Sequence, residues 1–133
     1  MYCFDTDVLS AAMRRDPPMH LIRRLATVPS EEQSTTAVTL GELLYCAAKR
    51  GSEPLQRVRD LVIGALDVFP FDEEAAEVYG VLRADLEAKG RRLDEPDLRI
   101  ASITRSRDLT LVTGNVRHFD RVPGLVLENW LAS

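Results

Sequence analysis

Short apolar runs alternate along the chain with segments whose apolar residues recur at helical spacing. The run from Met1 to Phe4 ends at Asp5 and predicts a strand. The segment after it predicts a helix, because its apolar residues return every three or four positions, at Val8, Leu9, Ala12 and Met13. The chain therefore opens with a strand that leads directly into a helix.

The same alternation continues along the rest of the chain. We expect further helices over residues 21–26, 39–48, 54–65, 72–89 and 95–107, and extended segments over 34–38, 68–70, 109–113 and 125–127. Residues 29–33 predict a loop, and Gly114-Asn115 predicts a turn. Strands that alternate with helices favour an α/β fold with a parallel sheet covered on both faces, in which ligands bind beyond the carboxyl ends of the strands.

Length and composition limit the class of protein. A chain of 133 residues fits a single domain, 1–133, and 45% hydrophobic with 29% charged residues is typical of a globular protein. The sequence shows neither a transmembrane pattern nor a secretory signal, so we expect a cytoplasmic protein with no membrane partner. Cys3 and Cys46 lie far apart and predict small apolar residues in packed elements, in preference to a zinc site or a disulfide.

The net charge of −4 argues against a protein that coats nucleic acid through overall positive potential. Local basic groups still offer contacts to phosphate, although each is more often a solvated face: Arg14-Arg15, Lys49-Arg50, Arg91-Arg92, and Arg105 with Arg107. The charge therefore does not exclude a nuclease.

Three acidic residues, Asp5, Glu42 and Asp97, each follow a predicted strand or stand at the start of a predicted helix. Each also has a simpler interpretation. Asp5 can cap the first helix. Glu42 lies three residues after Thr39, which is the spacing of a capping box, and Asp97 follows Asp94 at a helix start. Taken singly, the three residues do not distinguish a cap from a functional site.

Taken together, the three carboxylates fall at the predicted ligand edge of the sheet. Helix capping alone would not require them to lie together, so their shared position favours a functional site. Clustered carboxylates repel one another, and proteins keep such a cluster mainly where a cation neutralises it. Mg²⁺ or Mn²⁺ suits hard oxygen ligands and accepts phosphate oxygens in its shell. Such an ion orients and activates water for attack on phosphorus, so the reaction requires no His or Ser nucleophile.

Other polar residues lie near the same edge. Thr113 and Asn115 follow the fourth strand and have groups that can hydrogen-bond the carboxylates, while Asn115 also has the simpler role of a cap. His118 lies close by, although a histidine near a surface loop is common. His20 is adjacent to a Pro-Pro pair, and a packed or exposed role is simpler for it than catalysis.

These segments together resemble the PIN-domain ribonucleases, and within them the VapC-type toxins of toxin–antitoxin pairs, nearly from end to end. Residues 4–10 (FDTDVLS) are similar to the first motif of the family, 39–44 (TLGELL) to the second, 96–101 (PDLRIA) to the third and 111–115 (LVTGN) to the fourth. Each motif alone is weak, but four in this order and spacing are specific.

The resemblance implies a three-layer α/β/α sandwich with a mainly parallel sheet, and divalent-metal-dependent cleavage of RNA. It implies that Asp5, Glu42 and Asp97 are the catalytic ligands of Mg²⁺ or Mn²⁺, with supporting roles for Thr6, Thr113 and Asn115. It also implies an RNA substrate, a cognate antitoxin protein that blocks the site, and a homodimer. The segments 43–65 and 72–89 also contain more apolar residues than a helix needs to pack against one face of a sheet. The extra apolar surface favours the homodimer.

Two positions depart from the pattern of the family. His118 stands where the family often has a fourth acid, and Asp120 lies on the other side of Phe119, which puts a second metal position in doubt. Asp7 replaces the common asparagine and adds a negative charge, which Thr or backbone donors could satisfy instead of a metal.

Two alternatives remain. Asp5-Thr6-Asp7 has the spacing of the nucleophile and general acid of haloacid-dehalogenase-like phosphatases, and residues 111–115 mimic their second motif. That family also needs a later lysine, and none follows Lys89. The other alternative is a catalytically silent module that binds RNA or a protein. The presence of all three mutually repelling acids argues against it, because an inactive site has no need of them.

Overall fold

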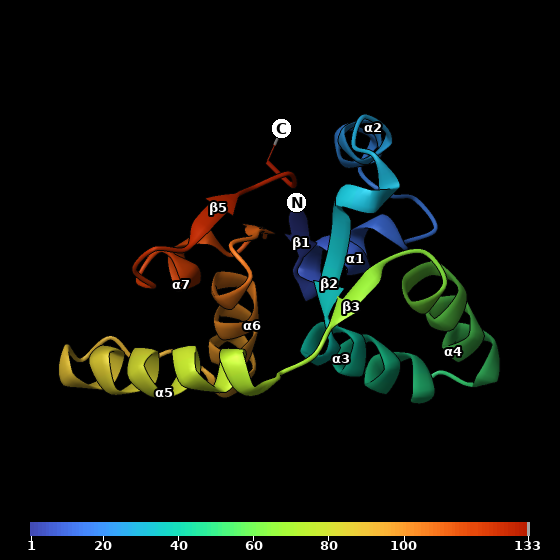
Figure 1. Ribbon diagram of the computed structural model, residues 1–133. Helices are drawn as coiled ribbons and strands as arrows, with labels where there is room; N and C mark the ends of the chain where they lie inside the picture. The colour runs from blue at the N-terminus through green and yellow to red at the C-terminus, as the bar shows by residue number, and fades with distance from the viewer. Residues whose placement is uncertain (133) are drawn as a thin grey trace.

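The computed structural model describes residues 1–132 and consists of a five-stranded parallel sheet between two layers of helices (Figure 1). All four strand pairings are parallel. In sheet order the strands are β3 (Asp67–Phe69), β2 (Gln33–Thr36), β1 (Tyr2–Phe4), β4 (Thr110–Val112) and β5 (Val126–Glu128). The predicted α/β/α sandwich with a mainly parallel sheet is confirmed.

The helices follow the predicted order with small shifts at their ends. They are α1 (Thr6–Ala12), α2 (Met19–Ala26), α3 (Ala37–Ala48), α4 (Ser52–Val58), α5 (Glu73–Ala88), α6 (Glu95–Ser106) and α7 (Val116–Phe119), with a short 3₁₀ helix η1 (Ser30–Glu32) and a π-helix η2 (Arg59–Ile63) that continues α4. Within residues 1–132, no helix is long and apolar enough to cross a membrane.

Two local predictions were wrong, and one short helix was missed. The strand expected over 34–38 ends at Thr36, because Ala37 and Val38 already belong to α3. The loop expected over 29–33 contains η1. The short helix α7 was not predicted, because four residues carry too little periodicity to be read from sequence.

The two faces of the sheet pack against separate hydrophobic clusters. In β4, Val112 joins the cluster formed with α1 to α4, and its neighbour Leu111 joins the cluster formed with α5, α6 and α7. Successive side chains of a strand point to opposite faces, so each strand contributes to both layers. The third layer is visible in Figure 1, where α5 and α6 lie across the sheet from α4.

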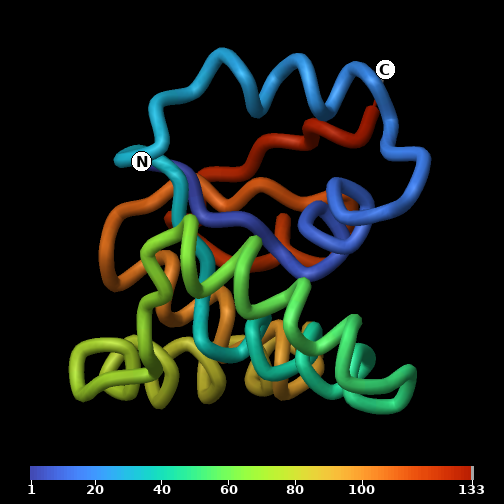
Figure 2. Tube along the Cα trace, turned by 90° about the vertical axis from the view of Figure 1, so that its right-hand side faces the viewer, coloured from blue at the N-terminus to red at the C-terminus, as the bar shows by residue number. Residues whose placement is uncertain are grey.

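The C-terminal segment packs back against the first strand and α2, as Figure 2 shows. The Trp130 ring meets the rings of Tyr2 and Phe4 edge-on, at centroid distances of 5.0 and 5.4 Å. His20 Nε2 lies 2.7 Å from the carbonyl oxygen of Leu131. His20 is half-buried and packs here, which is one of the two roles, packed or exposed, expected for it.

The two cysteines differ in environment. Cys3 is buried in β1, and burial raises the pKa of its thiol to about 12. Cys46 is exposed on α3, so the expectation of a packed residue is wrong for Cys46. Both thiols are free, as predicted.

The strand order determines where a ligand can bind. The chain runs from β1 outward to β2 and β3, and then returns to the other side of β1 to form β4 and β5. In sheets of this kind the ligand crevice lies outside the carboxyl ends of the strands where the order reverses. Here Asp5 directly follows β1 and Thr113 directly follows β4.

Candidate active site

Asp5 is both a helix cap and a buried carboxylate at the reversal point of the sheet. Its Oδ1 accepts a hydrogen bond from the Thr6 backbone N–H at 2.8 Å, and its Oδ2 accepts one from Thr113 Oγ1 at 2.8 Å. The capping interpretation is therefore confirmed, but it accounts for only one of the two oxygens. The second oxygen ties the end of β1 to the end of β4.

The pKa of Asp5 is raised from 3.8 to about 6. Burial is the largest cause, since only 6% of the residue is exposed, and the negative charges of Asp7 and Asp97 add to it, while the hydrogen bond from Thr113 opposes it. The ionised carboxylate is thus held in a site that lacks a compensating positive charge.

Glu42 lies in the second turn of α3 and is joined to the first helix. Thr6 Oγ1 donates a hydrogen bond to Glu42 Oε1 at 2.7 Å and also lies 3.3 Å from Thr39 Oγ1. The simpler interpretation of Glu42, a capping box with Thr39, is wrong, because Thr36 is the N-cap and accepts from the Thr39 backbone N–H at 3.1 Å. Glu42 therefore takes no part in capping α3, and its side chain points toward Thr6 at the candidate site.

Asp97 lies in the first turn of α6, next to His118 of α7. The predicted cap, Asp94, is at the N-cap position but makes no side-chain capping hydrogen bond. His118 Nδ1 lies 3.0 Å from Asp97 Oδ2 and 3.0 Å from Asn115 Nδ2. A protonated Nδ1 donates to Asp97, whereas a bare Nδ1 accepts from the Asn115 amide, so the tautomer of His118 selects its partner.

Asn115 is at the N-cap position of α7, but its side chain makes no capping hydrogen bond. Its backbone N–H instead donates to Thr113 Oγ1 at 3.0 Å, and that hydroxyl in turn donates to Asp5. The predicted supporting residues therefore form two short chains of hydrogen bonds, one through Thr113 to Asp5 and one through Thr6 to Glu42.

Asp7 and Gly114 form a contact that the motifs did not indicate. Asp7 Oδ2 accepts from the Gly114 backbone N–H at 2.9 Å, whereas Asp7 Oδ1 is buried without a hydrogen-bond partner among residues 1–132. A backbone donor thus satisfies one oxygen of Asp7, as expected. A Cβ on Gly114 would lie 2.8 Å from Asp7 Oδ2 and 2.7 Å from Leu131 Cδ1, so a larger residue there would displace the ends of these two side chains.

The residues suit a divalent cation in charge and in ligand type. Burial raises the pKa of both Asp5 and Asp7, Asp97 raises both further, and Asp7 Oδ1 has no donor. Within the part of the chain that the structure describes, no Lys or Arg forms an ion pair with Asp5, Asp7, Glu42 or Asp97. Carboxylate oxygens without positive neighbours are the donor set that Mg²⁺ and Mn²⁺ prefer.

The carboxylates share one edge of the sheet but are not drawn together around one point. Over residues 1–132, no three acidic, histidine or cysteine side chains are arranged to hold one ion. The metal roles of Asp5, Glu42 and Asp97 therefore stay a prediction from motif, position and charge.

Comparisons with known proteins identify the family of the chain. The PIN domain family matches residues 2–125. The chain is 31% identical to ribonuclease VapC2 of Rickettsia felis over 98% of both chains, and 35% identical to the tRNA(fMet)-specific endonuclease VapC of Salmonella typhimurium over 87% of this chain and 88% of that one.

The fold also matches a solved complex. The crystal structure of VapBC2 from Rickettsia felis, bound to a DNA fragment from its promoter, superposes on 97% of this chain and 98% of its own, with a TM-score of 0.86 and 31% identity. The family match spans nearly the whole chain, and the solved complex shares its fold. The chain therefore belongs to the PIN domain family and, within it, to the VapC group.

Proposed function

We propose that this chain is a ribonuclease that cleaves RNA phosphodiester bonds with a divalent cation, Mg²⁺ or Mn²⁺, and that it acts as the toxin of a toxin–antitoxin pair. The observation that carries the proposal is the buried Asp5 at the reversal point of the sheet, whose pKa is raised to about 6 beside two further acids. Its family relatives named as VapC ribonucleases support the reaction class.

The proposed metal ligands are Asp5, Glu42 and Asp97, each oriented by a neighbouring side chain. Thr113 holds Asp5 and Thr6 holds Glu42, at 2.8 and 2.7 Å, while His118 lies 3.0 Å from Asp97. When bound, the cation neutralises charge on the scissile phosphate and activates water. Hydrogen bonds of this kind fix the direction of the ligand oxygens and raise metal affinity.

Protonation of Asp5 opposes this role. With a pKa raised to about 6, Asp5 is largely ionised at neutral pH and becomes protonated in mild acid. A cation and a proton compete for the same carboxylate. The site should therefore bind metal weakly in mild acid and tightly above neutrality.

For the substrate we propose transfer RNA. The Salmonella typhimurium relative, 35% identical over 87% of this chain, is named a tRNA(fMet)-specific endonuclease, as is a relative from Shigella flexneri at 33% identity over 97% of the chain. Single-stranded loops of folded RNA are the usual targets of sequence-specific recognition, because their bases are unstacked. A tRNA is thus a suitable first substrate, with cleavage expected in one of its single-stranded loops.

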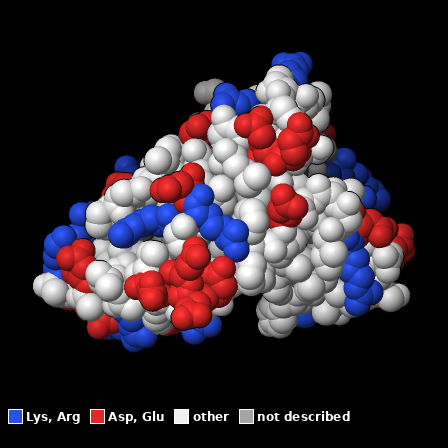
Figure 3. Space-filling model, viewed as in Figure 1, with Lys and Arg blue, Asp and Glu red and all other residues white. Residues whose placement is uncertain are grey.

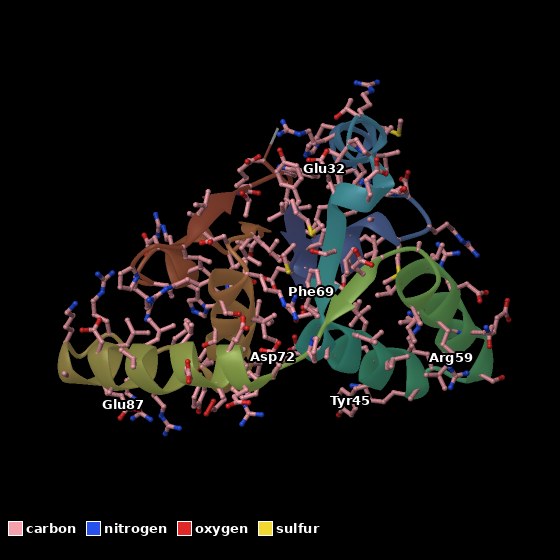
Figure 4. The ribbon with its side chains drawn as sticks, in the orientation of Figure 1. Glu32, Tyr45, Arg59, Phe69, Asp72 and Glu87 are labelled. Atoms are coloured by element: carbon pink, nitrogen blue, oxygen red, sulfur yellow. The ribbon has the colours of Figure 1, made fainter. Side chains whose placement is uncertain are left out.

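For partners we propose a cognate antitoxin and a second copy of this chain, in the cytoplasm. Similar chains are solved within VapBC complexes, from Rickettsia felis and from Salmonella typhimurium. Tyr45 on α3 is 64% exposed and points away from the sheet in Figure 4, and Val81 on α5 is 72% exposed. Large exposed apolar side chains such as these support an interface. A single mass near 14.9 kDa in sedimentation across a wide concentration range would contradict the homodimer.

The phosphatase alternative is not favoured, because the family match and the similar proteins point to nucleases. Thermal melting in Mn²⁺ distinguishes a catalytically silent binding module from a metal-dependent enzyme. A functional site gains stability as metal is added, by RT ln(1 + [L]/Kd), and this gain should disappear in Asp5→Asn. A melting temperature indifferent to both metals would favour the silent module.

The decisive experiment is cleavage of bulk tRNA by the purified chain, freed from any co-purified protein, with Mg²⁺ or Mn²⁺. EDTA and Asp5→Asn are the negative controls. Asp60→Asn, an exposed acid on η2 far along the chain from the motifs, is the matched control and should cleave like the wild type. Discrete products that disappear in both negative controls are expected, and an intact RNA pool under every metal would overturn the proposal.

A further inference from the structure

A basic groove lies beside the proposed active site, between the end of α1, the second half of α3 and α4. It encloses about 930 Å³. Four arginines line it, Arg14, Arg15, Arg50 and Arg57, together with one acidic residue, Glu53. The groove is therefore locally positive in a chain whose net charge is −4.

The arginines of the basic groove have no acidic partners in the described part of the chain. None of the four forms an ion pair there, whereas Arg83, Lys89 and Arg99 on the opposite side do, with acids of α5 and α6. Figure 3 shows acidic and basic side chains next to one another over α5 and α6. The arginines of the groove thus keep their charge available to a ligand.

One arginine also shapes the basic groove. Arg57 Nη2 donates to the backbone carbonyl of Met13 at 3.1 Å, which ties α4 to the end of α1. This contact holds two walls of the groove at a fixed separation. Over residues 1–132, Arg14, Arg15 and Arg50 make no side-chain hydrogen bond of this kind, and they extend from exposed positions.

The basic groove is continuous with the proposed active site through two helix faces. Ser10 lies four residues after Thr6 on α1, and Cys46 lies four residues after Glu42 on α3. Both Ser10 and Cys46 line the groove. Residues four apart share a helix face, with Cβ atoms about 6 Å apart, so the groove begins one turn from the hydrogen bond between Thr6 and Glu42.

We propose that the basic groove binds the phosphate backbone of the RNA substrate on one side of the scissile bond. This inference rests on the proposed function. A cluster of carboxylates repels a polyanion, and nearby unpaired arginines offset that repulsion. The guanidinium fork also matches phosphate geometry through two parallel hydrogen bonds. Arg14, Arg15 and Arg50 neutralise backbone phosphates, while the acids act on the phosphate that is cut.

The test is binding of fluorescently labelled bulk tRNA to the Asp5→Asn chain, followed by anisotropy between about 50 and 200 mM salt. The test variant adds Arg15→Gln and Arg50→Gln, and leaves Arg57 in place because it holds α4. We expect affinity to fall on the order of tenfold, and the slope of log K against log salt to fall by roughly 1.5, since two phosphate contacts are lost.

Two controls separate the basic groove from general charge. Arg23→Gln with Arg59→Gln removes two exposed arginines that do not line the groove, and Arg59 is seen on the continuation of α4 in Figure 4. This pair should leave the salt slope unchanged. Arg15→Lys with Arg50→Lys keeps the charge and should retain most of the slope. Equal slopes for the groove pair and its control pair would overturn the inference.

Cleavage kinetics distinguish this inference from the proposed function. With Asp5 intact, the pair Arg15→Gln and Arg50→Gln should raise KM for tRNA with little change in kcat. An unchanged KM in a chain that still cleaves RNA would overturn the groove and leave the nuclease standing. Unchanged tRNA binding together with weakened binding of the co-purified protein would identify the groove as a protein-docking surface, which also overturns the inference.

Discussion

Thr113 Oγ1 donates a 2.8 Å hydrogen bond to Asp5 Oδ2, which joins the ends of two neighbouring strands across 108 positions of sequence. Both residues are buried. The same hydroxyl accepts from the Asn115 backbone N–H at 3.0 Å. One threonine therefore couples the orientation of the proposed metal ligand to the turn that follows β4.

Asp5→Asn should stabilise the metal-free protein above pH 6. The raised pKa means that the folded state binds the Asp5 proton more tightly than the unfolded state, where the ordinary value is 3.8. The ionised carboxylate therefore costs stability above pH 6, and this cost is relieved as pH falls from 6 to 3.8. We expect a gain on the order of 2 kcal/mol at pH 7.5.

Thermal melts of the wild type and Asp5→Asn in EDTA, from pH 4 to pH 8, check this dependence. The asparagine keeps an oxygen for the Thr6 backbone N–H and an amide for Thr113, so packing is preserved. The difference in melting temperature should be several degrees above pH 6.5 and close to zero at pH 4. A difference that does not vary with pH would contradict the raised pKa.

Thr6→Val should lower cleavage about 10- to 100-fold, because it removes the hydroxyl that orients Glu42 at 2.7 Å while keeping the shape of the side chain. The measurement is the initial rate of tRNA cleavage across Mn²⁺ concentrations, which should show a weaker apparent metal affinity. Thr6→Ser restores the hydroxyl and should recover most of the rate. Equal rates for the valine and serine variants would show that Glu42 does not depend on Thr6.

His118→Ala should weaken metal-dependent cleavage about tenfold, because Asp97 Oδ2 loses its neighbour at 3.0 Å. His118→Asn places an amide nitrogen near the position of Nδ1 and should retain most of the activity. Manganese titrations of both variants, followed by melting temperature and by rate, provide the comparison. If alanine and asparagine behave alike, His118 does not position Asp97.

Gly114→Ala should destabilise the fold by about 1–3 kcal/mol, because a Cβ there lies 2.8 Å from Asp7 Oδ2 and 2.7 Å from Leu131 Cδ1. Gly80→Ala is the matched control: that glycine lies within α5, and a Cβ there meets nothing within 4 Å. The control should be neutral or stabilising by up to about 1 kcal/mol. Urea unfolding of the two variants measures the contrast, and equal midpoints would refute the close approach at Gly114.

The order of the elements could be predicted from the sequence, and so could the position of Asp5 and Asp97 next to a strand end or a helix start. Apolar runs and helical spacing are local properties, and burial of the apolar face of each element enforces them in the folded chain. Asp5 was placed at the end of a strand for that reason, and the structure has it directly after β1. The motif order then indicated the family that the comparisons show.

Predictions from local sequence patterns were wrong at two positions of α3. The spacing of Thr39 and Glu42 fits a capping box, yet Thr36 caps α3 because β2 ends there and the helix begins two residues earlier than predicted. Cys46 was expected to be packed, but α3 turns that position outward. In both cases the start and the rotation of one helix, set by its packing on the sheet, decided the outcome.

The sequence by itself determined that strands alternate with helices and that Asp5 and Asp97 stand where a strand ends or a helix begins, because periodicity and capping act within a few residues. Only the tertiary structure decided which side chains meet: Thr113 with Asp5, Thr6 with Glu42, His118 with Asp97, and Gly114 with Asp7. These contacts depend on the order β3-β2-β1-β4-β5, which brings the end of β4 beside the end of β1. That order follows from how the whole set of helices buries its apolar faces on both sides of the sheet, a property that no local stretch of sequence contains.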